Sequence, residues 1–596
     1  MPAEDGMMKT GKIIFTIITL TAIAGWIIWL FAFHKTQTES PYSSDIRLNQ
    51  VGFYPGGPKT AIIRNAPSGE FTIRRLSDHS VVFSDTMTES LRWSFSGEVV
   101  RKADFSAFDQ VGRYYLEVPL VGNSYPFLIE TNIHQHVLAT ILRSFYFQRS
   151  SQAIVAPFAE KWPRKAGHAD DQVKIHPSAA SASRPAGTLV SAPGGWYDAG
   201  DYGKYVPTAT FATWMLLGMY ETAPEQYDTF GLNIPESGNT LPDILDESLW
   251  SIRWLLTMQD PGEGFVCHKL TTSRHPGKIM PEDDRATRLM IGKSTAATLG
   301  FAAVMAQASR IIRKWEPGLA DSCLKASLAA WRWGRANPAV SFENPRDIET
   351  GPCLDYYFED ERAWAAAELW VTTREDSFYY VGKFGEQTFD DAPTRRNVGP
   401  LAWMSLLAQP VRLPVNGDEK IILRKLRLIT DRFRDHALTV SPYGVPVGDR
   451  ENDFLWGSNG NLASRGVLLM FMARKTGDAS YAAAATAALD YILGRNATGY
   501  CFITGVGSYS PMDIHHRISL TDGVFEPVPG LMAGGPQNEL NRDGCVYPDS
   551  LPATTYLDSF CSYTTNEVTI NWNAPLARLC GEIERWYTSH APVEAH

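Results

Sequence analysis

A change in the period of the hydrophobic residues near residue 133 constrains the fold of this chain more than any other feature. From residue 45 to about 130 the sequence consists of short β-branched and aromatic runs, such as TAIIR, FTIRRL and RYYLEV, separated by Gly, Pro, Ser and Asp. Beyond that point the hydrophobic residues recur with a helical period. The pattern predicts a small antiparallel β-sandwich over residues 45–131 and a large helical domain over residues 132–590.

Twelve helical segments are expected in the second domain. Several of them, including STAATLGFAAVMAQASRI, are apolar on more than one face, so we expect them to be buried on several sides. Twelve helices can close as six hairpins into an α/α barrel. The Pro- and Gly-rich segments 259–291 and 500–556 would then form the floor and walls of a groove. The expected helices begin near His136, Thr208, Pro242, Gly292, Ala320, Glu361, Ser377, Val398, Glu419, Asn459, Ser480 and Trp572.

An uncharged run of 21 residues, Ile13 to Phe33, is long enough to cross a bilayer as a helix. A cleavable signal peptide is the competing interpretation, because Ala22-Ile23-Ala24 resembles a processing site. Cleavage there would leave a very apolar terminus, so the sequence favours an uncleaved anchor. Residues 1–12 would then form a cytoplasmic tail, 13–33 a transmembrane helix and 34–44 a linker. The rest of the chain would be periplasmic or extracellular.

Charge and cysteine content exclude some partners. A net charge of −10 and a pI near 5.8 argue against binding to nucleic acid. The seven cysteines contain no C-x-x-C pair, which makes a structural zinc site unexpected. Cys545 and Cys561 lie near each other in the sequence and are the expected disulfide pair in an oxidising compartment. Nothing in the sequence indicates the oligomeric state.

The stretch GGWYDAGDYGKYV, residues 194–206, concentrates acids, glycines and rings. It places Asp198 and Asp201 three residues apart. Sugar-cleaving sites use such groups, since rings stack on pyranose faces, one carboxylate activates water and another acid protonates the leaving oxygen. The alternative is a polar turn before a helix, with Asp as its N-cap. The rings expected to contact a sugar here are Trp196, Tyr197 and Tyr202.

A second stretch, YLDSFCSYTTNEVTINWNAPL at residues 556–576, carries another acid, Glu567, between aromatic residues. Together the two stretches resemble the signatures of glycoside hydrolase family 9, the cellulase family. The resemblance implies an (α/α)6 barrel and no cofactor for the chemistry. The run LNQVGF at residues 48–53 resembles the start of the immunoglobulin-like module that precedes the catalytic domain in one branch of this family.

The resemblance also implies residue roles. Glu567 is expected to be the general acid, Asp201 the general base, and Asp198 a group that helps to hold the attacking water. His515 and Arg517 match a His-x-Arg pair that hydrogen-bonds the sugar beside the scissile bond. The other residues expected to bind substrate are Trp456, which as a single Trp could equally be a core residue, Tyr563 and Trp572.

Metal binding is implied only in part. Relatives often hold calcium near the groove, and the matching run TGPCLDYYFEDERAW keeps Asp360 and Glu361. Tyr356 and Tyr357 replace small or acidic residues there, which reduces the number of oxygen ligands for calcium. Zinc is not expected, because Ser150 and Ser151 stand where related chains have a cysteine ligand.

We therefore expect a membrane-anchored, inverting endo-β-1,4-glucanase that acts on β-1,4-glucan or cello-oligosaccharides. An exo-acting glucosaminidase or cellodextrinase of the same family is the alternative among enzymes. An inactive glucan-binding or assembly protein is the alternative of another class, disfavoured because all three carboxylates are present.

Overall fold

The computed structural model describes residues 41–67, 69–538 and 543–589, and the structural statements below refer to these. The expected cytoplasmic tail, transmembrane helix and most of the linker lie outside the described residues. Within them, one helical run, Thr295–Lys314, is long and apolar enough to cross a membrane. Because 89% of its apolar window is buried inside the protein, this run is a core helix of the fold.

The first domain is a two-sheet sandwich, as expected. One sheet has the order β1-β3-β7-β6, and the other has the order β2-β10-β8-β4-β5 with β9 beside β8. One detail of the prediction was wrong, since β10 pairs in parallel with β2. Many residues lie between these two strands, which gives the chain room for the crossover that parallel neighbours need. The strands are β1 (Ile46–Arg47), β2 (Gly52–Phe53), β3 (Thr60–Arg64), β4 (Glu70–Arg75), β5 (Val81–Thr86), β6 (Leu91–Arg92), β7 (Val99–Asp104), β8 (Gly112–Val118), β9 (Gly122–Asn123) and β10 (Phe127–Ile129).

Successive side chains of β3 pack into two different hydrophobic cores. Ile63 belongs to the core of the sandwich, together with Phe71 and Leu116. Its neighbour Ile62 points to the other face and joins the core of the helical domain. The two domains therefore share a continuous apolar contact.

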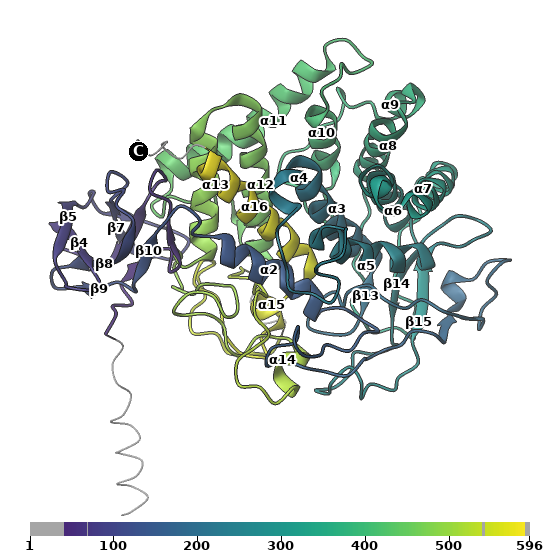
Figure 1. The fold of residues 1–596 in the computed structure, drawn as a ribbon, viewed down its shortest axis with the longest axis horizontal. Helices are drawn as coiled ribbons and strands as arrows, with labels where there is room; N and C mark the ends of the chain where they lie inside the picture. Colours follow the sequence, from purple (N-terminus) through teal and green to yellow (C-terminus); the bar gives the residue numbers. More distant parts are fainter. Residues whose placement is uncertain (1–40, 68, 539–542, 590–596) are drawn as a thin grey trace, which may run out of the picture. The chain divides into compact units, whose positions relative to one another are not determined.

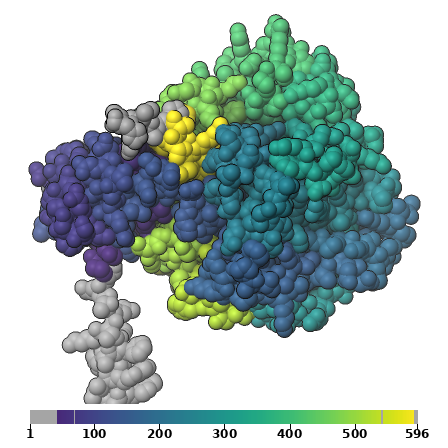
Figure 2. Space-filling model, viewed as in Figure 1, coloured from purple at the N-terminus to yellow at the C-terminus, as the bar shows by residue number. Residues whose placement is uncertain are grey.

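The run LNQVGF lies in this contact. Asn49 Nδ2 donates to Asp490 at 2.8 Å, and Gln50 Nε2 donates to the carbonyl of Gly499 at 2.7 Å. The side-chain oxygen Oε1 of Gln50 accepts from the backbone N–H groups of Ser508 and Tyr509. Tyr54 donates to Glu584 on the last helix at 2.6 Å, and Figure 2 shows the purple β domain beside the yellow end of that helix. The β domain thus holds a loop of the helical domain in place.

The second domain contains the twelve expected helices, arranged in two layers (Figure 1). α3, α6, α8, α10, α12 and α16 form the inner layer, in which α3 packs against both α6 and α16. The other six pack outside them, as α7 does on α6 and α13 on α12. The helices are α2 (Gln135–Phe147), α3 (Val206–Thr222), α5 (Asp243–Met258), α6 (Thr295–Ile311), α7 (Pro317–Ala336), α8 (Glu359–Thr373), α9 (Asp376–Gly382), α10 (Gly399–Ala408), α11 (Asp418–Asp435), α12 (Ser458–Thr476), α13 (Ala479–Ile492) and α16 (Ile570–Ser589).

Helices of the two layers differ in which of their residues are buried. Every residue of α6 from Thr295 to Ser309 is buried, because Ala, Gly and Ser let neighbouring helices approach on all sides. In α11 the buried residues, among them Ile422, Leu426 and Phe433, follow a single stripe. An all-apolar surface suits an inner helix and a stripe suits an outer one.

A five-stranded sheet in the helical domain was not predicted. Its order is β12-β11-β15-β14-β13, and β14 and the first part of β15 come from the segment 259–291, which was expected to be only a loop. Its strand β13 directly follows the Asp198–Asp201 turn and pairs with β14. The strands are β11 (Val173–Ile175), β12 (Leu189–Val190), β13 (Lys204–Tyr205), β14 (Cys267–Thr271) and β15 (Leu289–Lys293), and the short helices are α4 (Pro224–Tyr227), α14 (Arg517–Thr521) and α15 (Tyr563–Asn566).

The expected disulfide is present. Cys545 and Cys561 are bonded, with their Cα atoms 6.2 Å apart. The bond closes the loop just before the segment that carries Glu567.

Candidate active site

Backbone hydrogen bonds bring the two acidic stretches together. The N–H of Ile570 donates to the carbonyl of Asp198 at 2.9 Å, although the residues lie far apart in sequence. The N–H of Arg517 donates to the carbonyl of Gly200 at 3.0 Å, and the N–H of His515 donates to Asn566 at 2.9 Å. Three segments are thus tied to one another, and each carries candidate site residues.

The positions of the inner helices explain this assembly. α3 begins at Val206, five residues after Asp201, and α16 begins at Ile570, three residues after Glu567. α12 likewise begins just after Trp456. The candidate residues therefore lie on the loops that lead into the same ends of neighbouring inner helices.

Gly200 permits the close approach of two of these segments. A Cβ atom at this position would lie 1.8 Å from the carbonyl oxygen of His515. That oxygen belongs to the backbone and cannot move aside as a flexible side chain would. The small residue between Asp198 and Asp201 is therefore required by packing.

We expect Gly200→Ala to lower turnover at least tenfold and to destabilise the protein by about 1–3 kcal/mol, because the overpacked turn must move away from His515. Steady-state kinetics and denaturant unfolding measure both effects. Gly318→Ala is the control, since a Cβ at that helical glycine meets nothing within 4 Å. Equal behaviour of the two variants would contradict the packing role.

The two aspartates have different surroundings. Asp201 Oδ1 accepts from the N–H of Gly203 at 2.6 Å, and Oδ2 lies 3.3 Å from His275 Nδ1. Asp198 Oδ1 is buried without a hydrogen-bond partner among the described residues. Burial raises the pKa of Asp198 to about 7; the nearby charge of Asp201 adds to the rise, and a hydrogen bond with Thr208 opposes it.

The surroundings of Glu567 favour the protonated form of its carboxyl. Its carbonyl accepts from the N–H of Gly534 at 2.8 Å, which fixes the backbone. Burial raises the pKa of its carboxyl well above the usual range, and the charges of Asp201 and Asp198 raise it further. Arg517 and a hydrogen bond with Trp456 lower it by smaller amounts. A carboxylic acid of this kind can donate a proton to a leaving group.

The structure brings three further candidate residues, His515, Tyr563 and Trp456, close to one another. His515 stacks on Phe560 and donates from its Nδ1 to the carbonyl of that residue at 2.6 Å, which leaves Nε2 for another partner. Tyr563 lies between His515 and Trp456, at ring distances of 6.0 and 5.7 Å. Trp456 is 43% exposed, so a large part of its surface is open to a ligand.

Arg517 and Trp572 are half-buried. Arg517 donates to the carbonyls of Pro276 and Gly200, so its guanidinium ties two loops together beside the acids. Trp572 lies against the start of α12, where a Cβ at Gly460 would come within 2.2 Å of its ring. Both residues border the site, and the loops around them depend on their side chains.

The first three rings do not fit the role that the sequence suggested. Trp196, Tyr197 and Tyr202 are at most 2% exposed, so none offers a face on which a sugar could stack. Each is instead tied to the protein: Trp196 donates to Glu247 at 2.7 Å, Tyr197 pairs with His168, and Tyr202 donates to Ile279. These rings support the Asp198–Asp201 turn from behind.

Sequence reasoning missed His275, which lies on the loop between β14 and β15. The loop is fixed near the acids because Arg517 donates to Pro276 and Tyr202 donates to Ile279. His275 thereby reaches Asp201 Oδ2. No motif marked this residue; its only signal was its place in a segment expected to line the groove.

We expect His275→Ala to lower kcat about tenfold with little change in KM, because it removes the imidazole that lies 3.3 Å from the carboxylate of Asp201, the candidate general base. Arg274→Ala is the matched control on the same loop, since Arg274 is 76% exposed and pairs with Glu349. Steady-state kinetics distinguish the two. A His275→Ala enzyme with unchanged kcat would show that Asp201 needs no support from this loop.

The expected calcium residues lie together, but they do not form a recognisable metal centre. No group of three or more His, Cys, Asp or Glu side chains arranged for a metal ion occurs among the described residues. Asp360 and Glu361 are buried, and each has one carboxylate oxygen without a hydrogen-bond partner in that part of the chain. Burial and the charges of Asp360 and Asp355 raise the pKa of Glu361 well above its usual value. Calcium binding at Asp360 and Glu361 stays a prediction.

Known proteins provide an independent comparison. The family model described as glycosyl hydrolase family 9 matches residues 134–580, and the model of the cellulase N-terminal ig-like domain matches residues 42–123. A xyloglucan-specific endo-beta-1,4-glucanase of Bacteroides ovatus is 37% identical over 556 residues, which cover 90% of this chain and 93% of that protein. A cellodextrinase of Butyrivibrio fibrisolvens is 31% identical and covers 89% of this chain and 98% of its own.

A solved structure agrees with these matches. The structure named Bacteroides ovatus GH9 superposes with a TM-score of 0.85 at 36% identity, covering 91% of this chain and 99% of that one. The superposition spans both domains. The chain therefore belongs to glycosyl hydrolase family 9, and it is a glycoside hydrolase whose catalytic domain follows a cellulase-type immunoglobulin-like domain.

Proposed function

We propose that this glycoside hydrolase is an inverting endo-β-1,4-glucanase with Asp201 as general base and Glu567 as general acid. The observation that supports it most is the set of backbone hydrogen bonds that holds the Asp198–Asp201 turn against the Glu567 segment. The raised pKa of Glu567 and the bound, oriented carboxylate of Asp201 give the two acids different tasks.

The proposed reaction has one step. Water attacks the anomeric carbon from the side of Asp201, which takes one water proton, while Asp198 helps to hold that water. The bond between the anomeric carbon and the glycosidic oxygen breaks, and this oxygen takes the proton of Glu567. Such a geometry needs roughly 6.5–9.5 Å between the acid and base carboxyls to admit the water.

Substrate assays with the purified full chain test the proposal. We expect new reducing ends from soluble cellulosic polymer, and xyloglucan belongs in the panel because a similar protein is named for it. Chitosan oligomers belong there too, as substrates for the glucosaminidase alternative. Absence of hydrolysis on every β-1,4-linked substrate would contradict the proposal.

Exo-acting cellodextrinase is the second candidate, favoured by the similarity to a protein of that name. The two activities differ in their products. An endo-acting enzyme lowers the viscosity of a soluble polymer early, while few bonds are cut. Stepwise shortening of cello-oligosaccharides with the viscosity unchanged would favour the second candidate instead.

We also propose that residues 13–33 anchor the enzyme in a membrane, with the catalytic domain on the periplasmic or extracellular side. The support is the uncharged 21-residue run itself. Fractionation tests this proposal, because an anchored enzyme stays in the membrane pellet through a high-salt wash and leaves it in detergent. Release by salt, or a mature chain that starts at Gly25, would contradict it.

A further inference from the structure

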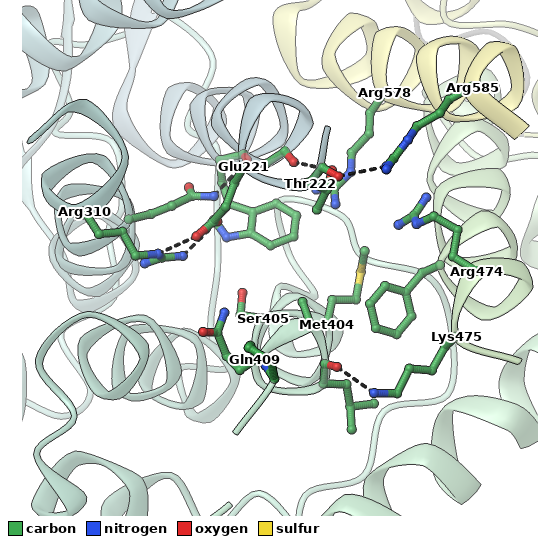
Figure 3. Close-up of a pocket in the computed structure, with 17 residues that line it drawn as sticks. Glu221, Thr222, Arg310, Met404, Ser405, Gln409, Arg474, Lys475, Arg578 and Arg585 are labelled. Atoms are coloured by element: carbon green, nitrogen blue, oxygen red, sulfur yellow. Dashed lines mark hydrogen bonds and ion pairs between the residues drawn. The ribbon is translucent and has the colours of Figure 1, made fainter. Parts of the chain in front are cut away.

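A cavity of about 560 Å³ lies at the C-terminal ends of inner helices, opposite the ends that carry the candidate active site (Figure 3). Glu221 and Thr222, which line it, are the last two residues of α3, whose first residue follows the Asp198–Asp201 turn. Arg474 and Lys475 line it from the last turn of α12. A helix of 17 residues is about 25 Å long. The cavity is therefore separate from the catalytic site.

Five cationic side chains line the cavity, and three of them are engaged by protein partners. Arg310 is held by Glu221 and Glu368, and its position at the end of α6 complements the carbonyl end of that helix. Lys475 is held by the carbonyl of Leu407 and by Glu419. Arg585 is held by the carbonyl of Thr222 and by Glu225. These three cations serve the helix ends and have little capacity left for a ligand.

Arg474 and Arg578 differ from the other cations. Both pair with one carboxylate, Glu582, at 2.5 and 3.0 Å. Arg474 uses only Nη1 in this pair, and within the described part of the chain neither its Nε nor its Nη2 is paired with an acceptor. Nη2 of Arg578 is likewise unpaired there. Two guanidinium groups with one carboxylate carry a net charge of +1.

The position of Arg578 is built into the fold. Its guanidinium lies over the ring of Trp214 at 4.8 Å. A Cβ atom on the adjacent Gly218 would come within 2.6 Å of Arg578 Nη1, so the absence of a side chain there leaves room for the guanidinium in its present position. The side chain is 3% exposed. Arg578 is thus fixed in one orientation before any ligand binds, which lowers the entropic cost of binding.

Gln307 supplies an acceptor in the same cavity. The residue is 1% exposed and lines the cavity from α6. Its Nε2 donates weakly to the carbonyl of Trp214 at 3.4 Å, whereas its Oε1 is buried and has no hydrogen-bond partner among the described residues. A buried carbonyl oxygen of this kind is costly unless a donor reaches it, so it indicates a hydroxyl or a water in the cavity.

We propose that this cavity binds a small hydroxylated monocarboxylate, of the chemical class of a sugar acid. The spare N–H groups of Arg474 and Arg578 would bind the carboxylate as a fork, and its single negative charge would balance their net charge. Gln307 Oε1 would accept from a ligand hydroxyl. Met404 and Phe471 give the cavity an apolar wall, and its volume lies within the range of small-molecule sites.

Isothermal titration calorimetry on the full chain tests the proposal with D-gluconate as the probe. We expect gluconate to bind and neutral glucose not to bind. Arg474→Gln should weaken gluconate binding at least about tenfold, and Arg474→Lys by less, since it keeps the charge but loses the fork. Circular dichroism confirms that each variant is folded.

Arg585→Gln is the matched control, because it removes an equal charge from the same lining at a side chain whose two Nη atoms are already engaged by Thr222 and Glu225. We expect this variant to bind gluconate within about twofold of the wild type. Equal loss in both variants would overturn the assignment to Arg474 and Arg578. Binding of inorganic phosphate without gluconate, or of no anion at all, would overturn the ligand class. Because binding is measured directly, none of these outcomes depends on the hydrolase activity.

Discussion

Glu567→Gln is expected to lower turnover of unactivated β-1,4-glucan by about 10²–10⁴-fold, because the amide cannot protonate the leaving oxygen. Aryl glycosides with a highly acidic leaving group, such as dinitrophenol, need no proton and should keep most of their rate. The raised pKa of Glu567 also sets a pH limit. Since the protonated form is active, wild-type kcat should fall as pH rises through that pKa, and this fall should be absent in the variant on the activated substrate.

Glu526→Gln is the control for this substitution, since Glu526 is 49% exposed and pairs with Lys161 on the surface. It should leave turnover on both substrates unchanged. Equal losses of Glu567→Gln on activated and unactivated substrates would show that Glu567 is not the proton donor.

Asp201→Asn is expected to lower activity on both kinds of substrate by about 10²–10⁴-fold, because water activation is needed whatever group leaves. Asp198→Asn should be severe but less complete, since Asp201 can still take the proton. Asp347→Asn is a suitable control, as that carboxylate is 70% exposed. If the Asp201→Asn variant kept near-normal turnover while the Asp198→Asn variant was inactive, Asp198 rather than Asp201 would be the general base.

The helices were predictable because their signal is local. Each of the twelve expected helices begins within three residues of its expected position. The periodicity of an apolar face, as in α11, or an apolar run with small residues, as in α6, needs no knowledge of distant partners. The β-sandwich followed similarly from short runs and turns, whereas the parallel pairing of β2 and β10 depends on the path of the intervening chain.

The sheet β11–β15 was missed for a related reason. Its strands have two to five residues, and β11 pairs with β15 across more than a hundred residues of sequence. So short a run has no measurable period, and only the distant partner makes it a strand.

The sequence marks the three acids as catalytic candidates, and their roles stay a prediction; it does not distinguish the functions of the rings around them. A ring beside an acid is the expected pattern both for a sugar platform and for a core residue that supports the acid. Trp456 is exposed, whereas Trp196, Tyr197 and Tyr202 are buried, and only the tertiary fold distinguishes them. The contact of His275 with Asp201 arises from loop packing and likewise has no sequence signature.

The stereochemistry of the first product tests the central claim most directly. Proton NMR during the first minutes of cello-oligosaccharide hydrolysis, before mutarotation, shows which anomer forms at the new reducing end. An inverting reaction by Asp201 and Glu567 predicts that the α-anomer appears first and the β-anomer grows in later. Initial appearance of the β-anomer would show retention and would contradict the one-step mechanism.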